Sequence, residues 1–233
     1  MNRMQFRQFE SGETLYENQL SGKKDVMDWI AEGRVEIDES ENKMVLENEL
    51  DPDLYGDDAH WVLWCPKELP DRITIEWDFY PLEEPGLCMI FFAAHGQDGH
   101  DLFSEKLPKR TGYYPQYHSG SMNALHLSYF RHKHSEERAF RTCNLRKSSG
   151  FHLVAQAADP LPPVEDACPP YHIKLVKYEG IVQFSINDLP LLEWEDQGEY
   201  GPIYSGGYIG FRQMAPMKAA YSNLTIKHAL LKN

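Results

Sequence analysis

The sequence lacks any long hydrophobic run, since no stretch approaches the roughly 18 consecutive apolar residues that a membrane-spanning helix needs. Its four cysteines, at positions 65, 88, 143 and 168, form no CxxC pair, so the paired spacing of a zinc site is missing. The first residues show no apolar segment followed by a small-residue cleavage site. We therefore expect a cytoplasmic protein with reduced cysteines. Its 42% hydrophobic and 12% aromatic content excludes intrinsic disorder.

Positive charge is scarce in the chain as a whole and concentrated in one segment. The 233 residues include 23 Lys and Arg against 36 Asp and Glu, a net charge of −13. Residues 106–147 hold nine basic and two acidic residues, so this segment carries +7 and the rest of the chain −20. An acidic protein repels nucleic acid and anionic membranes, and we expect neither as a partner. The basic segment suits a small anion such as a uronate; alternatively, its charges pair with acidic neighbours in the fold.

Short strand patterns separated by Gly and Pro turns run through the sequence. Residues 73–80 alternate, with apolar side chains at the odd positions, which is typical of a strand with one buried face. Residues 87–94 form a continuous apolar run, which predicts a central strand covered on both faces. Further strands are predicted at residues 124–130, 151–156, 171–177, 181–186, 189–194, 208–211 and 220–228. The pattern predicts an all-β jelly-roll sandwich of two antiparallel sheets.

A proline-rich stretch at residues 159–170 interrupts this pattern. The strands after it are too few for an independent domain, so we interpret it as a long loop within one domain, 1–233. Residues 1–14 are interpreted as an N-terminal extension. The one short helical turn is expected at residues 23–30.

Two sets of motifs carry a resemblance to known proteins. Residues 182–194, 206–212 and 220–226 resemble, in order and spacing, the end of concanavalin A-like (laminin G-like) jelly rolls. Motifs at residues 64–66, 77–79, 84–94, 117–120, 123–131, 137–147 and 210–218 resemble the bacterial YesU-like family of unknown function, over about residues 15–227. The resemblance implies a lectin- and glucanase-like jelly roll and a setting in pectin (rhamnogalacturonan) utilisation. It implies no particular reaction.

Polar side chains are dense in residues 117–147. They can hydrogen-bond hydroxyl groups, and arginine binds a carboxylate through two parallel hydrogen bonds. We therefore predict a site for short acidic oligosaccharides, of pectin type, on the concave sheet; the alternative is a non-enzymatic protein-interaction module on a lectin-like fold. The predicted substrate-binding residues are His118, Asn123, Ser128, Arg131, Arg138, Arg141, Asn144, Gln156 and Arg212, with Tyr113, Tyr114, Tyr117 and Tyr129 as candidate flat faces against a sugar ring.

If the protein is an enzyme, the candidate catalytic residues are Asp78 and His126. A carboxylate beside an imidazole raises its pKa and fixes its tautomer, which tunes a base to neutral pH. Hydrolysis of a glycosidic bond needs two carboxyl groups, and Glu76 shares a strand face with Asp78. Elimination from a uronate needs a neutral base and an arginine, which His126 with Arg131 or Arg141 offers. A structural Asp–His hydrogen bond is the alternative.

The acidic turn at residues 51–58 begins like an EF-hand loop, with Asp51, Asp53 and Gly56 in place. Its twelfth position is Val62 where a glutamate is needed, so the ligand set is incomplete. We predict no cofactor and no metal needed for folding, with a loose calcium site at this turn as the alternative. Two histidines in residues 95–101 lack a third ligand for zinc.

Overall fold

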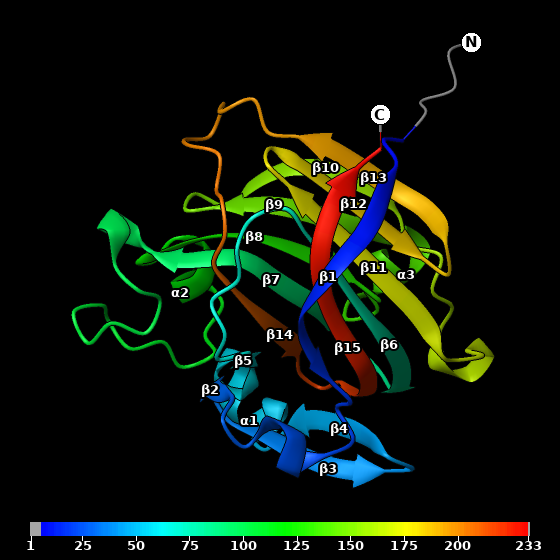
Figure 1. The fold of residues 1–233 in the computed structure, drawn as a ribbon. Helices are drawn as coiled ribbons and strands as arrows, with labels where there is room; N and C mark the ends of the chain where they lie inside the picture. Colours follow the sequence, from blue (N-terminus) through cyan, green and yellow to red (C-terminus); the bar gives the residue numbers. More distant parts are fainter. Residues whose placement is uncertain (1–5, 233) are drawn as a thin grey trace.

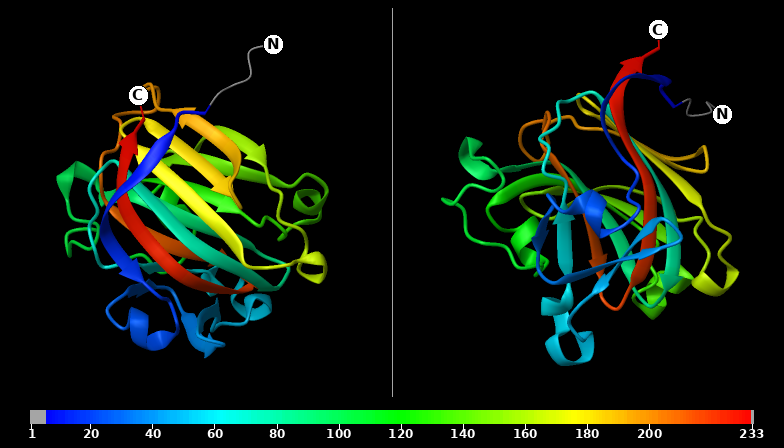
Figure 2. Two further views of the ribbon diagram at one scale, coloured as in Figure 1. Left: turned by 45° about the vertical axis from the view of Figure 1, so that its right-hand side comes forward. Right: turned by 60° about the horizontal axis from the view of Figure 1, so that its bottom comes forward.

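Two antiparallel β-sheets packed face to face form the protein in a computed structural model that describes residues 6–232, except the Arg138 side chain. The eight-stranded sheet lies in front of the seven-stranded sheet in the left view of Figure 2. Its strands are β1 (Phe9–Asn18), β3 (Val35–Ser40), β4 (Lys43–Asn48), β6 (Ile73–Glu83), β11 (Tyr171–Tyr178), β12 (Ile181–Ile186), β13 (Leu189–Glu195) and β15 (Lys218–Leu231). They run in the order β13-β12-β11-β6-β15-β4-β3, with β1 paired to β15 (Figure 1).

The seven-stranded sheet carries the candidate site. Its strands are β2 (Ile30–Glu32), β5 (Trp61–Trp64), β7 (Leu87–Gly96), β8 (Met122–Tyr129), β9 (Thr142–Ser148), β10 (His152–Ala158) and β14 (Tyr208–Met214), in the order β10-β9-β8-β7-β14-β5-β2. Short helices occupy the connections: η1 (Lys23–Val26), α1 (Pro52–Tyr55), η2 (Gly56–Ala59), η3 (Gln97–Gly99), α2 (Pro115–His118), α3 (Ser135–Ala139) and η4 (Val164–Asp166). The prediction of an all-β sandwich of two antiparallel sheets is confirmed.

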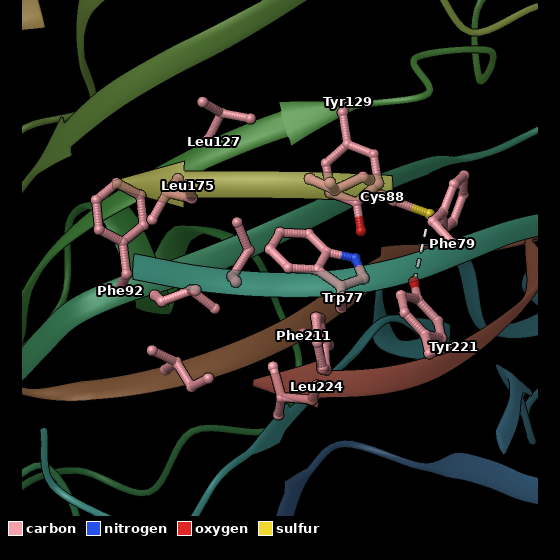
Figure 3. Close-up of a cluster of buried hydrophobic side chains, with 14 of the residues drawn as sticks. Trp77, Phe79, Cys88, Phe92, Leu127, Tyr129, Leu175, Phe211, Tyr221 and Leu224 are labelled. Carbon is pink, nitrogen blue, oxygen red and sulfur yellow. Dashed lines mark hydrogen bonds between the residues drawn. The ribbon is translucent and has the colours of Figure 1, made fainter. Parts of the chain in front are cut away.

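The core lies between the sheets and follows the alternation of the strands. Trp77 and Phe79 of β6 point inward and pack against Tyr129 of β8 and Phe211 of β14 (Figure 3). The Tyr221 hydroxyl is also buried there and lies 3.6 Å from the sulfur of Cys88 in β7 (Figure 3). Side chains of a strand alternate between its two faces, so the residues next to Trp77 and Phe79 along β6 point away from the core.

Strand β7 is buried on both faces, as its continuous apolar run predicts. Its inward side chains join the core between the sheets. Its outward side chains, Met89 and Phe91, form a second apolar cluster with Trp64, Leu102 and Tyr117. The last two belong to the segment 97–121, which carries α2 and covers this part of the sheet (Figure 1).

Several segments differ from the sequence interpretation or add to it. Residues 9–14, expected in an N-terminal extension, form the start of β1 and pair with β15. Strands β2, β3, β4, β5 and β9 were not anticipated. The proline-rich stretch 159–170 connects β10 of one sheet to β11 of the other. Over residues 6–232, no helix is long and apolar enough to span a membrane.

Candidate functional site

A row of polar side chains crosses the outer face of the seven-stranded sheet. Ser128 of β8 is opposite Asn144 of β9, which in turn is opposite Gln156 of β10. The Gln156 amide donates to Asn144 Oδ1 at 2.7 Å. Their sequence neighbours Leu127 and Leu145 are in the core, so strand alternation turns the polar side chains outward. We call this row, with Thr142, Arg131, Glu137 and Arg146 along its edges, the polar band.

Arg146 lies two residues beyond Asn144, on the same face of β9. Its guanidinium carbon is 4.0 Å from the centre of the Phe151 ring, and Nη1 donates to the Phe151 carbonyl at 3.1 Å. The His118 ring is 4.1 Å from the same ring centre. A guanidinium and an imidazole cannot share one ring face at these distances, so Phe151 lies between them. Burial lowers the pKa of Arg146, and no described carboxylate lies within ion-pair distance of it.

Arg131 lies at the other end of the polar band. Its Nη1 donates to Thr142 Oγ1 at 2.8 Å and its Nη2 to Glu137 Oε1 at 2.5 Å. Thr142 and Arg146 are four residues apart on β9, a span of about 13 Å in an extended strand. Two arginines thus bracket the Asn144 and Gln156 amides, and one of them already has a carboxylate partner.

Aromatic and imidazole rings form a wall beside the band. The Tyr114 hydroxyl is 3.0 Å from His126 Nε2, and the His126 ring packs against Phe91 and Phe151. Burial, reinforced by the charge of Arg146, lowers the pKa of His126 well below its usual value. Burial raises the pKa of Tyr114 to about 12, against the opposing effect of nearby arginines. Both rings are therefore neutral near pH 7 and shape the band without charging it.

Arg212 of β14 positions this wall rather than contacting ligand. Its side chain is fully buried, and Nη1 donates to the Gly112 carbonyl at 2.7 Å. Its guanidinium carbon lies 4.8 Å from the Tyr114 ring centre and 5.3 Å from that of Tyr117. The predicted substrate-binding role of Arg212 is wrong in this structure, because a side chain with no exposed surface cannot touch a sugar. It ties the segment around α2 to the sheet.

The predicted pairing of Asp78 with His126 is also wrong. Asp78 lies on β6 of the eight-stranded sheet, where it bonds to His172 Nδ1 at 3.1 Å and to Asn223 Nδ2 at 2.8 Å. His126 lies on the outer face of the other sheet, so the apolar core separates the two side chains. Glu76, the expected partner of Asp78 in hydrolysis, forms an ion pair with Lys174 at 3.0 Å.

Two further predicted residues, Asn123 and Arg141, are not in the band. Asn123 lies at the other end of β8, where it accepts from the Tyr204 hydroxyl at 3.5 Å. Arg141 donates to the Leu161 carbonyl at 3.5 Å and so anchors the proline-rich loop. The Arg138 side chain is outside the described residues. The predicted residues that do share the outer face or its cover are His118, His126, Ser128, Arg131, Asn144, Gln156 and Arg212.

Sequence reasoning placed Arg146 in the basic segment without choosing it as a site residue. A signal would have been present had β9 been predicted, because Asn144 was chosen and a strand repeats its face every second residue. Phe151, which fixes the Arg146 guanidinium, carries no comparable signal. Its contribution depends on the turn between β9 and β10.

In the acidic turn at 51–58, one carboxylate accepts a hydrogen bond from the backbone of the turn itself. Asp51 caps α1, its Oδ1 accepting from the Asp53 amide at 2.9 Å. Within the described part of the chain, no group of three or more His, Cys, Asp or Glu side chains is arranged to hold a metal ion.

Comparisons with known proteins agree with the fold. A family model described as "Domain of unknown function (DUF1961)" matches residues 13–226. The chain is 56% identical over 223 residues to the uncharacterized protein YesU of Bacillus subtilis, covering 95% of this chain and 99% of that protein. A crystal structure of a Bacillus subtilis protein of unknown function with a galectin-like fold superposes with a TM-score of 0.92, at 55% identity, over 97% of this chain and 100% of the other. The carbohydrate-binding module CBM66 from Bacillus subtilis shares the fold, with a TM-score of 0.53 at 11% identity, over 85% of this chain and 94% of the module.

Proposed function

The chain belongs to the DUF1961 family of YesU-like proteins, and we propose that it binds short acidic oligosaccharides of pectin type on the polar band. The fold it shares with a carbohydrate-binding module supports a ligand of this class. Free thiols at all four cysteines support a cytoplasmic setting, where only short oligosaccharides would be met.

The observation that carries the proposal is the state of Arg146. Arg146 is half-buried and has no carboxylate partner among the described residues. Its guanidinium has lost part of its hydration and contacts the Phe151 carbonyl and ring, but no opposite charge balances it. Its plane is fixed against Phe151, so it is pre-organised to donate to an incoming carboxylate. The exposed Gln156 amide beside it supplies donors and acceptors for sugar hydroxyls, and the buried Asn144 amide holds Gln156 in place.

The arrangement favours binding over hydrolysis. The polar band includes one carboxylate, Glu137, which is held by Arg131. The described outward-facing side chains on the strands of this sheet add Glu32, held by Arg110 at 2.7 Å. Glu32 is on β2, four strands from β8, a distance of about 19 Å at normal strand spacing. Hydrolysis of a glycosidic bond needs two carboxyl groups about 5 to 10 Å apart.

The test is a calorimetric titration with trigalacturonate and with an uncharged trisaccharide. Because a hydrogen bond to a charged group contributes about 1.5–3 kcal/mol, Arg146→Gln should weaken trigalacturonate binding by about 10- to 100-fold. Arg146→Lys should retain part of the affinity, since it keeps the charge and loses the planar fork. Added salt should weaken binding to the wild type.

The matched control is Arg72→Gln, which removes an arginine from an exposed ion pair with Glu179 on the other sheet and should leave affinity unchanged. The proposal fails if Arg146→Gln, correctly folded, binds trigalacturonate as tightly as the wild type. It also fails if the uncharged trisaccharide competes equally for the polar band.

A further inference from the structure

A second concave site lies outside the polar band, where three loops meet. The cavity has a volume of about 770 Å³ and is formed by residues 68–71 before β6, 95–102 after β7, and 205–208 at the start of β14. This volume is within the range of small-molecule sites in proteins. The polar and aromatic side chains that line it are Glu68, Asp71, His95, His100, Asp101, Ser205 and Tyr208.

The loops around this cavity are fixed to one another. Leu69 and Gly207 exchange backbone hydrogen bonds of 3.0 and 2.9 Å, which ties the first loop to the third. The Tyr208 hydroxyl donates to Asp101 Oδ2 at 2.6 Å, which ties the third to the second. Gly207 has a φ of +142°, and a Cβ there would lie 2.5 Å from the Ala94 carbonyl oxygen, so the close approach requires glycine. The hollow therefore has a fixed shape before any ligand arrives.

The lining offers hydrogen-bond acceptors. Glu68, Asp71 and Asp101 contribute carboxylates, and no Lys or Arg is found among the described lining residues. His95 Nδ1 lies 3.2 Å from the Ala93 carbonyl, which can only accept, so Nδ1 carries a proton and donates to it. Acceptors of this density repel an anion and favour a ligand rich in O–H or N–H donors.

Two of the carboxylates are already engaged. Asp71 accepts from Lys177 Nζ at 2.8 Å, and Asp101 from Tyr208. Lys177 balances the charge of Asp71, whereas the neutral Tyr208 hydroxyl leaves the charge of Asp101 unbalanced. A polyhydroxylated ring can use the remaining lone pairs of all three carboxylates. The rings of Tyr208 and the two histidines provide flat surfaces against a sugar.

From these contacts we propose that the cavity binds an uncharged sugar, as a second site distinct from the polar band. The cavity and the polar band differ in the charge that they prefer. The polar band selects a carboxylate, whereas the cavity excludes it. A protein with both can hold an oligosaccharide of mixed acidic and neutral residues, or two separate sugars.

The experiment is an NMR titration of the ¹⁵N-labelled full chain with galactose, rhamnose and glucosamine as separate probes. Galactose or rhamnose should shift the backbone amides of residues 99–102 and 205–208. Glu68→Gln and His100→Ala should each weaken this binding by about tenfold, because each removes an acceptor or a contact surface from the ligand. Arg146→Gln should leave it unchanged.

The converse titration keeps the two proposals separable. Trigalacturonate binding should be unaffected by Glu68→Gln and His100→Ala, whether or not it responds to Arg146→Gln. The cavity proposal is overturned if neither neutral sugar shifts these amides, or if their binding is lost in Arg146→Gln and kept in the cavity variants. It is also overturned if glucosamine binds much more tightly than galactose, since the site would then select a cation.

Discussion

Three arginines, Arg212, Arg141 and Arg146, have different surroundings in the fold. Arg212 is fully buried and holds the segment around α2. Arg141 anchors the proline-rich loop through a backbone carbonyl. Arg146 is half-buried against Phe151 and has no carboxylate partner among the described residues. An arginine becomes a binding group where its plane is fixed, its charge is left uncompensated and part of it is exposed. Arg212 meets the first two conditions but has no exposed surface, and no ring contact fixes the Arg141 plane among the described residues, so Arg146 meets all three.

His126 makes a prediction for the pH dependence of stability. Its pKa in the folded protein is well below the usual 6.5, chiefly through burial. Below pH 6.5 the unfolded chain therefore binds a proton at this residue that the folded chain does not, and the free energy of unfolding falls as the pH falls. The loss approaches about 1.4 kcal/mol per pH unit for such a group.

Urea denaturation of the wild type and of His126→Asn between pH 7.5 and pH 5 measures this effect. The variant, whatever its stability at pH 7.5, should lose less stability on acidification. Equal slopes for the wild type and His126→Asn would show that His126 does not stay neutral in the folded protein.

At the scale of elements, β9 links the two sheets through a buried ion pair. Lys147 points inward, is fully buried, and lies 2.7 Å from Asp196 Oδ2. Its Nζ also donates to the carbonyls of Gly201 and Pro202. The segment 196–202 connects β13 of one sheet to β14 of the other, so this lysine fixes the crossing between the sheets.

Lys147→Met should destabilise the protein by about 3–5 kcal/mol, because it leaves the Asp196 carboxylate buried and unpaired. Adding Asp196→Leu should restore part of the loss, since no charge then remains buried. Thermal or urea unfolding measures both variants, with Arg72→Gln as an exposed ion-pair control expected to change stability by under about 0.5 kcal/mol. A loss below about 1 kcal/mol in Lys147→Met would contradict the structural role of this pair.

Strand β9 also shows why some strands cannot be predicted from the alternation of apolar residues. The strand at 73–80 was predictable because its inward side chains are all apolar. In β9 the inward positions are Cys143, Leu145 and Lys147, and the lysine breaks the apolar alternation. Its charge is satisfied only by Asp196, 49 residues later in the chain, which no local pattern reveals.

The same limit applies to the site. Alternation correctly turned Asp78 and His126 away from the core, but a strand pattern does not say to which sheet a strand belongs. That depends on the strand order, in which β6 pairs with β11 and β15 while β8 pairs with β7 and β9. The band residues Ser128, Asn144 and Gln156 were predicted from their hydrogen-bonding side chains, whereas the pairing of β8, β9 and β10 that brings them together was not, because β9 was not predicted as a strand. Phe151 and Tyr114 were not predictable as partners, since their positions depend on a turn and on the segment around α2.

For the whole molecule, pairing within the fold resolves part of the uneven charge of the sequence. Within the basic segment, Arg110, Arg131 and Lys147 each have a carboxylate partner, namely Glu32, Glu137 and Asp196. The segment is therefore not a uniform basic patch, and the alternative that its charges pair within the fold holds for these three. On the polar band, the charge without a carboxylate partner among the described residues is that of Arg146, beside neutral hydrogen-bonding side chains. A single charge of this kind favours one carboxylate over an extended polyanion.

The most direct measurement of the central claim is a ¹H–¹⁵N NMR titration of the full chain with trigalacturonate, following side-chain as well as backbone signals. We predict that the side-chain amides of Asn144 and Gln156 and the Nε–H of Arg146 shift together with one affinity, and that these shifts disappear in Arg146→Gln. Trigalacturonate shifts confined to the outer face of the eight-stranded sheet, around Asp78 and His172, or no shift at the polar band at saturating ligand, would contradict the account.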